Sequence, residues 1–318
     1  MLILYIIALI FLCLLLFWAS SWMIEALMRI ARYLQWQEFV VAFFIMAFAA
    51  SVPNLFVGIS SALHQIPELS FGDIIGGNLI DLTVVLGLAT LIAKELPAKS
   101  KIIQTSALFT IVVAILPLVL IWDGTLGRGD GLILISSFIF YIGWLFGKKE
   151  RFSKTYEEEE VPPVIGFKHF LKDLGKITLG ITILIFAAEG IVRTASYFAE
   201  SLNLSLPLIG ILIVSMGNAL PEAYFAIVSA RKGKTWLILG DLMGSVIIPA
   251  TLVLGIVSLI TPIVIVDFSP FVIGRFFMIA AALLFLLFIS SGKKVTRKEA
   301  VVLLGLYIFF IICELSAR

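Results

Sequence analysis

Two acidic residues lie within long apolar runs, where an ionised side chain is expensive. Asp81 falls in the run NLIDLTVVLGL, and Glu222 directly follows a proline in GNALPE. An ionisable residue inside an apolar span costs roughly a few kcal/mol, so it indicates a functional site. Carboxylates without a nearby His or Cys suit hard cations such as Na⁺ or Ca²⁺, or a proton, better than transition metals. These two acids therefore predict a site for a hard cation, with a hydrogen-bonded structural acid as the alternative.

Other oxygen atoms near the two acids could complete a coordination sphere. Pro53 and Pro221 each interrupt an apolar run, and a proline inside a helix frees a backbone carbonyl that needs a partner in the membrane. The hydroxyl and amide side chains that could join the carboxylates are those of Ser51, Asn54, Thr83, Ser215, Asn218 and Thr251.

Asp73 and Asp241 follow a glycine at the predicted start of an apolar run. An aspartate at a helix start commonly caps the free backbone N–H groups there. We expect both residues to be N-caps, and keep them as alternative ion ligands.

The composition indicates an integral membrane protein. The 318 residues are 61% hydrophobic and 14% charged, with a mean hydropathy of +1.13. So little polar surface excludes soluble enzymes and nucleic-acid binders. We therefore predict an all-α polytopic protein whose partners are the lipid bilayer and inorganic cations, and which acts as a monomer without a cofactor.

Charge clusters divide the chain into ten candidate spans of about 20 residues, the length that a bilayer requires. The predicted spans are 2–24, 39–63, 73–93, 102–122, 131–147, 177–199, 206–230, 236–262, 269–290 and 300–315. Helices 1–5 form a first unit, 1–147, and helices 6–10 form a second, 177–318. The polar connection between them, 148–176, contains the acidic run Glu157–Glu160.

The basic residues orient the predicted bundle. Most of the 23 Lys and Arg residues follow odd-numbered spans, and loops rich in these residues stay on the cytoplasmic side. We therefore expect a multi-pass protein of the cell membrane, with both termini outside and the acidic connection in the cytoplasm.

The two units are related by an internal repeat. Sliding the sequence by 168 residues without a gap places residues 45–89 on 213–257. The matched pairs include Pro53 with Pro221, Gly72-Asp73 with Gly240-Asp241, and Thr83 with Thr251. Because each unit has an odd number of spans, the copies enter the membrane from opposite sides. This predicts an inverted repeat with broken helices 2 and 7, the architecture of secondary transporters.

At the repeat centres the sequence resembles the sodium/calcium exchanger family of the cation/calcium antiporter superfamily. The carrying motifs are AASVPN at 49–54, GDIIGGNLID at 72–81, GNALPE at 217–222 and GDLMGS at 240–245. The resemblance implies that Asn54, Asp81, Glu222 and Pro249 occupy the four central ligand positions, with Ser245 as the retained serine of the second motif. It implies exchange of Ca²⁺ for Na⁺ by alternating access.

Two departures from the family pattern leave alternatives open. Asn54 stands at a usual glutamate, and Pro249 at a position that is commonly acidic or amide. Because only two central ligands are then acidic, exchange coupled to H⁺, or of another divalent cation, is the alternative. A cation channel is a further alternative that hydropathy alone does not exclude.

An intramembrane aspartyl protease is the one enzyme alternative, because Gly127-Arg128-Gly129-Asp130 spells GxGD. That chemistry needs a second intramembrane aspartate, typically after a tyrosine, and the sequence has no Tyr-Asp pair. We expect a turn at Asp130 and no enzymatic activity.

Overall fold

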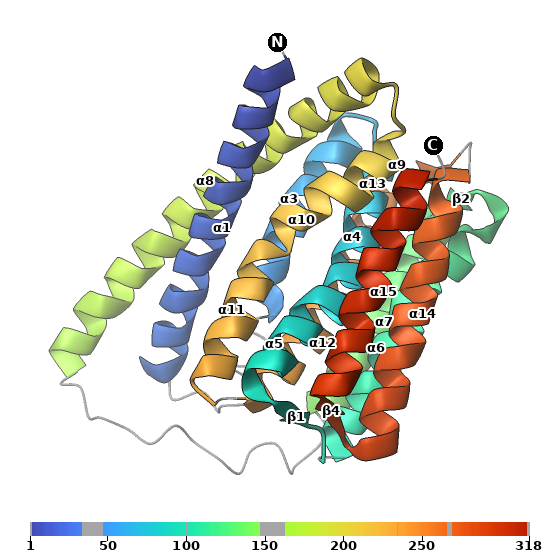
Figure 1. The fold of residues 1–318 in the computed structure, drawn as a ribbon. Coiled ribbons are helices and arrows are strands. Elements are labelled where there is room, and N and C mark those ends of the chain that lie inside the picture. Colours follow the sequence, from blue (N-terminus) through green and yellow to red (C-terminus); the bar gives the residue numbers. More distant parts are fainter. Residues whose placement is uncertain are drawn as a thin grey trace.

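The computed structural model describes residues 2–33, 47–99, 101–146, 163–233, 235–265 and 269–316, and these are nearly all helical (Figure 1). The α-helices are α1 (Leu2–Tyr33), α3 (Ala47–Leu63), α4 (Glu68–Ile80), α5 (Leu86–Ala93), α6 (Lys101–Leu120), α7 (Arg128–Phe146), α8 (Pro163–Leu202), α9 (Leu206–Ile209), α10 (Ser215–Asn218), α11 (Leu220–Arg231), α12 (Thr235–Ile248), α13 (Leu254–Ile260), α14 (Ser269–Gly292) and α15 (Arg297–Ser316). The π-helical stretches are η2 (Asp81–Val85), η5 (Gly210–Val214) and η6 (Pro249–Val253), and η3 (Ile121–Asp123) is a 3₁₀ turn.

The described residues confirm a polytopic membrane protein. Eight helices are long and apolar enough to cross a membrane, and the bent pair 206–218 and 220–231 makes a ninth. The predicted second span, 39–63, is described only as the 17-residue helix α3, so the count of ten stays a prediction. Both chain ends lie at the same end of the bundle (Figure 1), as an even number of spans requires.

One helix is much longer than predicted. The sixth span was expected over 177–199, but α8 begins at Pro163 and ends at Leu202. The second half of the predicted connection 148–176 is therefore helical, because its residues continue the amphipathic pattern of the span. The acidic run 157–160 lies outside the described residues.

Two short antiparallel ladders tie the two halves together. β1 (Glu95–Pro97) pairs with β4 (Lys294–Thr296), and β2 (Thr125–Leu126) pairs with β3 (Ile263–Val264). The offset of 168 residues carries β1 onto β3 and β2 onto the start of β4. Each half thus completes the ladder of the other, which is the interlocking expected of a duplicated unit.

The π-helical stretches obey the same offset. η2 at 81–85 falls on η6 at 249–253. A π-turn inserts one extra residue into a helix and occurs mostly at functional sites. Both copies of the repeat therefore widen at the same point, immediately at the predicted ligand position.

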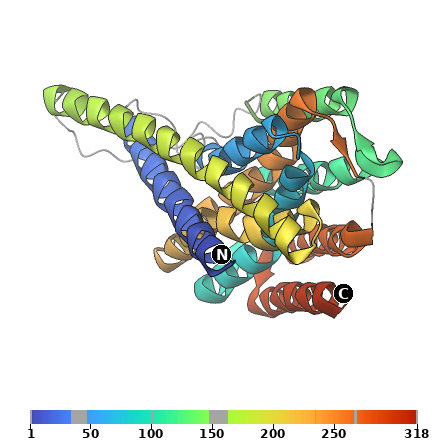
Figure 2. The same ribbon diagram turned by 90° about the horizontal axis from the view of Figure 1, so that it is seen from above.

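α1 and α8 form a pair along one side of the bundle (Figure 2). Arg29 of α1 holds Asp173 of α8 through both carboxylate oxygens, with Nη2 2.8 Å from Oδ1 and Nε 2.9 Å from Oδ2. The intrahelical pair of Glu25 and Arg29 expected from the sequence is looser, at 3.8 Å. The fork of Arg29 therefore joins two helices rather than only neutralising its own.

Replacing Asp173 with Asn is expected to loosen this helix pair. The Asp173 side chain is 5% exposed, and losing a charged, bidentate partner costs about 1–3 kcal/mol. Thermal unfolding of the detergent-solubilised variant should show a lower Tm. Glu25→Gln is the control, because that carboxylate is 64% exposed and should leave the Tm unchanged. Equal Tm values for Asp173→Asn and the wild type would contradict the assignment.

Candidate functional site

Four carboxylates lie buried in the helices around the two repeat centres. Asp73 of α4 is 0% exposed, Asp241 of α12 is 2% exposed, and Asp81 of η2 and Glu222 of α11 are each 4% exposed. Two of them come from the first half of the chain and two from the second. Buried charges need partners, so the contacts of each carboxylate decide what it can do.

Each carboxylate of the first half receives a hydrogen bond from the second half. Asn218 Nδ2 donates to Asp73 Oδ2 at 2.7 Å, and Ser245 Oγ donates to Asp81 Oδ2 at 2.7 Å. Glu222 interacts electrostatically with Asp81 most strongly, and also with Asp241 and Asp73. The four acids therefore form one electrostatic group that spans both halves.

Several oxygen atoms in this group have no hydrogen-bond donor among the described residues. They are Asn54 Oδ1, Asp73 Oδ1, Asp81 Oδ1, Asn218 Oδ1, Glu222 Oε2 and Asp241 Oδ2. An unsatisfied buried polar atom costs about 1–3 kcal/mol, and more when it is charged. A set of acceptors with no donors is what a bound cation would satisfy.

The carboxylates do not form a closed metal cage. Within the described part of the chain, no three His, Cys, Asp or Glu side chains are placed so that they could hold one ion together. An ion bound here would combine one or two carboxylates with amide, hydroxyl or carbonyl oxygens. Such mixed, flexible oxygen shells suit Ca²⁺ and Na⁺ better than Zn²⁺.

The break predicted in the seventh span is confirmed. α10 ends at Asn218 and α11 begins at Leu220, with a bend of 40° between 206–218 and 220–231. Pro221 lies in the first turn of α11, where its missing N–H costs nothing. The bend places Asn218 and Glu222 on either side of Ala219, both buried.

The equivalent segment of the second span differs from the expectation. α3 runs as one helix from Ala47 to Leu63 with Pro53 inside it, so the predicted interruption at 49–54 is corrected. Pro53 still cannot donate to the carbonyl of Ala49. Asn54 follows it, is 5% exposed, and occupies the position equivalent to Glu222.

Asp73 and Asp241 are not helix caps. α4 begins at Glu68 and α12 at Thr235, so both aspartates lie well inside their helices. Their carboxylates cannot satisfy free N–H groups at a helix start. The expectation of N-caps is therefore wrong, and the alternative of ion ligation gains support.

The four predicted hydroxyl ligands are buried, and each donates to a backbone carbonyl four residues earlier. Ser51 donates to Ala47 at 2.7 Å and Thr251 to Ile247 at 2.5 Å, while Thr83 and Ser215 donate to Leu79 and Ile211. Only their oxygen lone pairs remain for a cation. Unlike Ser245, these hydroxyls have no recorded bond to a carboxylate.

The sequence reasoning missed one residue at the site. Asn78 is 1% exposed, and its Nδ2 atom has no hydrogen-bond acceptor within the described residues. It lies three residues before Asp81, on the same side of the helix. That spacing is visible in NLID and was the available signal.

The GxGD motif forms a turn, as expected. Asp130 Oδ2 accepts a hydrogen bond of 2.8 Å from the backbone N–H of Gly127 at the start of α7. This carboxylate caps a helix and lies outside the buried group. The structure thus gives the protease alternative no support at Asp130.

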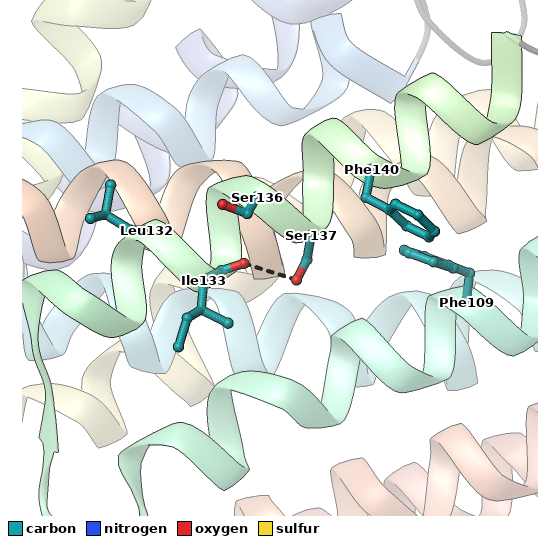
Figure 3. Close-up of a pocket in the computed structure, with 6 residues that line it drawn as sticks. All are labelled: Phe109, Leu132, Ile133, Ser136, Ser137 and Phe140. Atoms are coloured by element: carbon teal, nitrogen blue, oxygen red, sulfur yellow. Dashed lines mark hydrogen bonds between the residues drawn. The ribbon is translucent and has the colours of Figure 1, made fainter.

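The most prominent pocket lies elsewhere, on the outer side of the bundle. It measures about 420 Å³ between α6 and α7, where Phe109 faces Phe140 (Figure 3). Ser137 in its wall donates to Ile133 of its own helix at 2.9 Å. The pocket contains no charged side chain, so it is not a cation site.

An interlocked inverted repeat with buried carboxylates at its centre defines a membrane carrier for cations. The chain belongs to the sodium/calcium exchanger protein family, whose sequence profile matches residues 4–147 and 173–315.

Individual relatives agree with that membership. The sodium/calcium exchanger MaX1 of Methanosarcina acetivorans is 25% identical, covering 92% of this chain and 93% of its own. The inner membrane protein YrbG of Escherichia coli is 27% identical, covering 70% of each chain. A structure of the sodium-calcium exchanger NCX_Mj soaked with Na⁺ and Sr²⁺ superposes with a TM-score of 0.69 at 26% identity, covering 98% of this chain and 99% of that one.

Proposed function

We propose that this protein exchanges Ca²⁺ for Na⁺ across a membrane and binds both ions at the four buried carboxylates. One observation carries the proposal. Asp73, Asp81, Glu222 and Asp241 each present a buried oxygen that lacks a donor among the described residues. A secondary antiporter needs such a site, because the free energy for moving one ion comes only from binding and releasing the other.

Asp81 and Glu222 are proposed as the central pair. Their mutual interaction is the strongest that Glu222 makes with another acid, and Ser245 fixes one oxygen of Asp81. Asn54 and Asn218 supply neutral amide oxygens nearby. Hard oxygen ligands of this kind bind Ca²⁺ and Na⁺.

Asp73 and Asp241 are proposed as flanking ligands that restore the missing negative charge. The usual acidic positions hold Asn54 and Pro249, but two buried aspartates lie eight residues before Asp81 and Pro249. With all four acids ionised, the group can balance one Ca²⁺ or several Na⁺ in turn. Coupling to Na⁺ therefore does not require a contribution from H⁺.

The hydroxyls of Ser51, Thr83, Ser215 and Thr251 are proposed to ligate only through their lone pairs. We further propose that one chain carries out exchange, because both halves of the site come from it. The orientation proposed from the basic residues places both termini outside the cell membrane and the acidic connection inside.

Reconstituted vesicles test this function directly. Vesicles loaded with Na⁺ should accumulate radiolabelled Ca²⁺ from a Na⁺-free medium, and vesicles loaded with K⁺ at equal pH should not. Equal uptake by both would contradict coupling to Na⁺. Uptake that follows only an imposed pH gradient would favour H⁺ coupling instead.

Asp73→Asn and Asp241→Asn test the flanking acids. Each is expected to raise the Ca²⁺ concentration for half-maximal uptake by about tenfold or more, because each removes one buried charge near the ion. Asp123→Asn is the control, since that side chain is exposed and accepts only from the backbone N–H of Thr125. Wild-type affinity in both site variants would return Asp73 and Asp241 to a purely structural role.

A further inference from the structure

A cysteine of α1 lies directly on the break between α10 and α11. A Cβ atom added to Gly217 would lie 2.4 Å from Cys13 Sγ and 3.1 Å from Cys13 Cβ. Only glycine allows this approach, so the thiol is pressed against the backbone of the broken helix. One turn further along α1, Phe17 meets the ring of Tyr224 edge-on at 5.4 Å, so this side of α1 faces both arms of the break.

The thiol has two unsatisfied oxygen ligands beside it. Gly217 is followed by Asn218, whose Nδ2 is held by Asp73 Oδ2. Asn218 Oδ1 and Asp73 Oδ1 have no donor among the described residues, and these side chains are 2% and 0% exposed. Cys13 also interacts electrostatically with Asp73.

We propose that Cys13, Asp73 and Asn218 form a binding site for a thiophilic divalent cation such as Cd²⁺, which blocks exchange by joining α1 to the ion site. This inference rests on the proposed function for its inhibitory effect, but not for the binding itself. On binding, the Cys13 thiol gives its proton to water, and its sulfur forms a bond with the cation. Asp73 Oδ1 and Asn218 Oδ1 supply the oxygen ligands.

Softness separates such a cation from the transported ions. Thiolates select soft metals, whereas Ca²⁺ and Na⁺ prefer oxygen. A soft cation gains a ligand from α1 that Ca²⁺ does not use. It is therefore held at the junction of three helices, α1, α4 and α10, and leaves slowly.

The binding test uses purified full-length protein and Cd²⁺ alone. Wild type should develop the ultraviolet charge-transfer absorption of a Cd²⁺–thiolate bond, and Cys13→Ser should not. Cys313→Ser is the matched control: Cys313 is the other cysteine, packs in the separate apolar cluster with α15, and should leave the absorption intact. No absorption in the wild type, or its loss only in Cys313→Ser, would overturn the proposal.

The transport test measures how Cd²⁺ inhibits Ca²⁺ uptake, expressed for each variant against its own uninhibited rate. Cys13→Ser should need at least about tenfold more Cd²⁺ for half inhibition, since one ligand of the soft cation is gone. Equal sensitivity of Cys13→Ser and wild type would refute the blocking role. Absence of Ca²⁺ uptake in the uninhibited wild type would instead count against the proposed function, and the absorption test would still decide the site.

Discussion

Glu222→Gln is expected to abolish Na⁺-driven Ca²⁺ uptake, lowering it by at least about 100-fold, while the protein stays folded. Such a loss corresponds to about 2.8 kcal/mol of ion-binding free energy. Glutamine keeps the shape of Glu222 but removes the charge that faces Asp81, Asp241 and Asp73. Because like charges repel in the ion-free protein, the Tm of the variant should equal or exceed that of the wild type.

Ligand-dependent stability separates a lost site from a lost fold. Ca²⁺ should raise the Tm of the wild type, since an ion that binds only the folded state stabilises it, and should leave Glu222→Gln unchanged. Glu200→Gln, on an exposed position of α8, is the control and should behave as the wild type. A Glu222→Gln protein that transports Ca²⁺ at the normal rate would remove Glu222 from the site.

Gly72→Ala is expected to be among the most destabilising single-methyl changes in the chain. A Cβ at this position would lie 2.0 Å from the carbonyl oxygen of Pro207, and one at Gly76 would lie 2.4 Å from that of Ile211. The obstacle is backbone, which cannot rotate away, so α4 must separate from α9 and η5. We expect a loss of about 3 kcal/mol or more, at the upper end of overpacking costs.

The repeat supplies a matched control for this substitution. Gly240 is the equivalent of Gly72, but a Cβ there meets nothing within 4 Å. Gly240→Ala should keep or raise the Tm, because alanine favours a helix by up to about 1 kcal/mol over glycine. Because Asp73 follows Gly72, only Gly72→Ala should also weaken Ca²⁺ binding. Equal Tm values for the two variants would contradict the close crossing.

The comparison of these glycines shows where sequence reasoning ends. The repeat pairs Gly72-Asp73 with Gly240-Asp241, and nothing in the residues says which glycine lies at a backbone crossing. Likewise, Asp81 and Glu222 could be found because an acid in an apolar span is conspicuous. Their partners could not, since Ser245 reaches Asp81 only through the fold.

Helix boundaries explain the principal error at the site. His64, Gln65 and Glu68 gave the segment before Asp73 the polarity of a loop, so the helix was predicted to begin at 73 rather than at Glu68. That shift turned a buried ligand candidate into an expected cap. The π-helical stretches η2 and η6 were also unpredictable, because an extra residue in a helical turn is stabilised by surrounding packing rather than by its own sequence.

Equilibrium binding of radiolabelled Ca²⁺ to the purified protein tests the central claim most directly. The wild type should bind Ca²⁺ that Na⁺ displaces, and the double variant Asp81→Asn/Glu222→Gln should bind none while remaining folded. Ca²⁺ binding to the double variant with unchanged affinity, or wild-type binding that Na⁺ does not displace, would contradict a shared site for the two ions at the buried carboxylates.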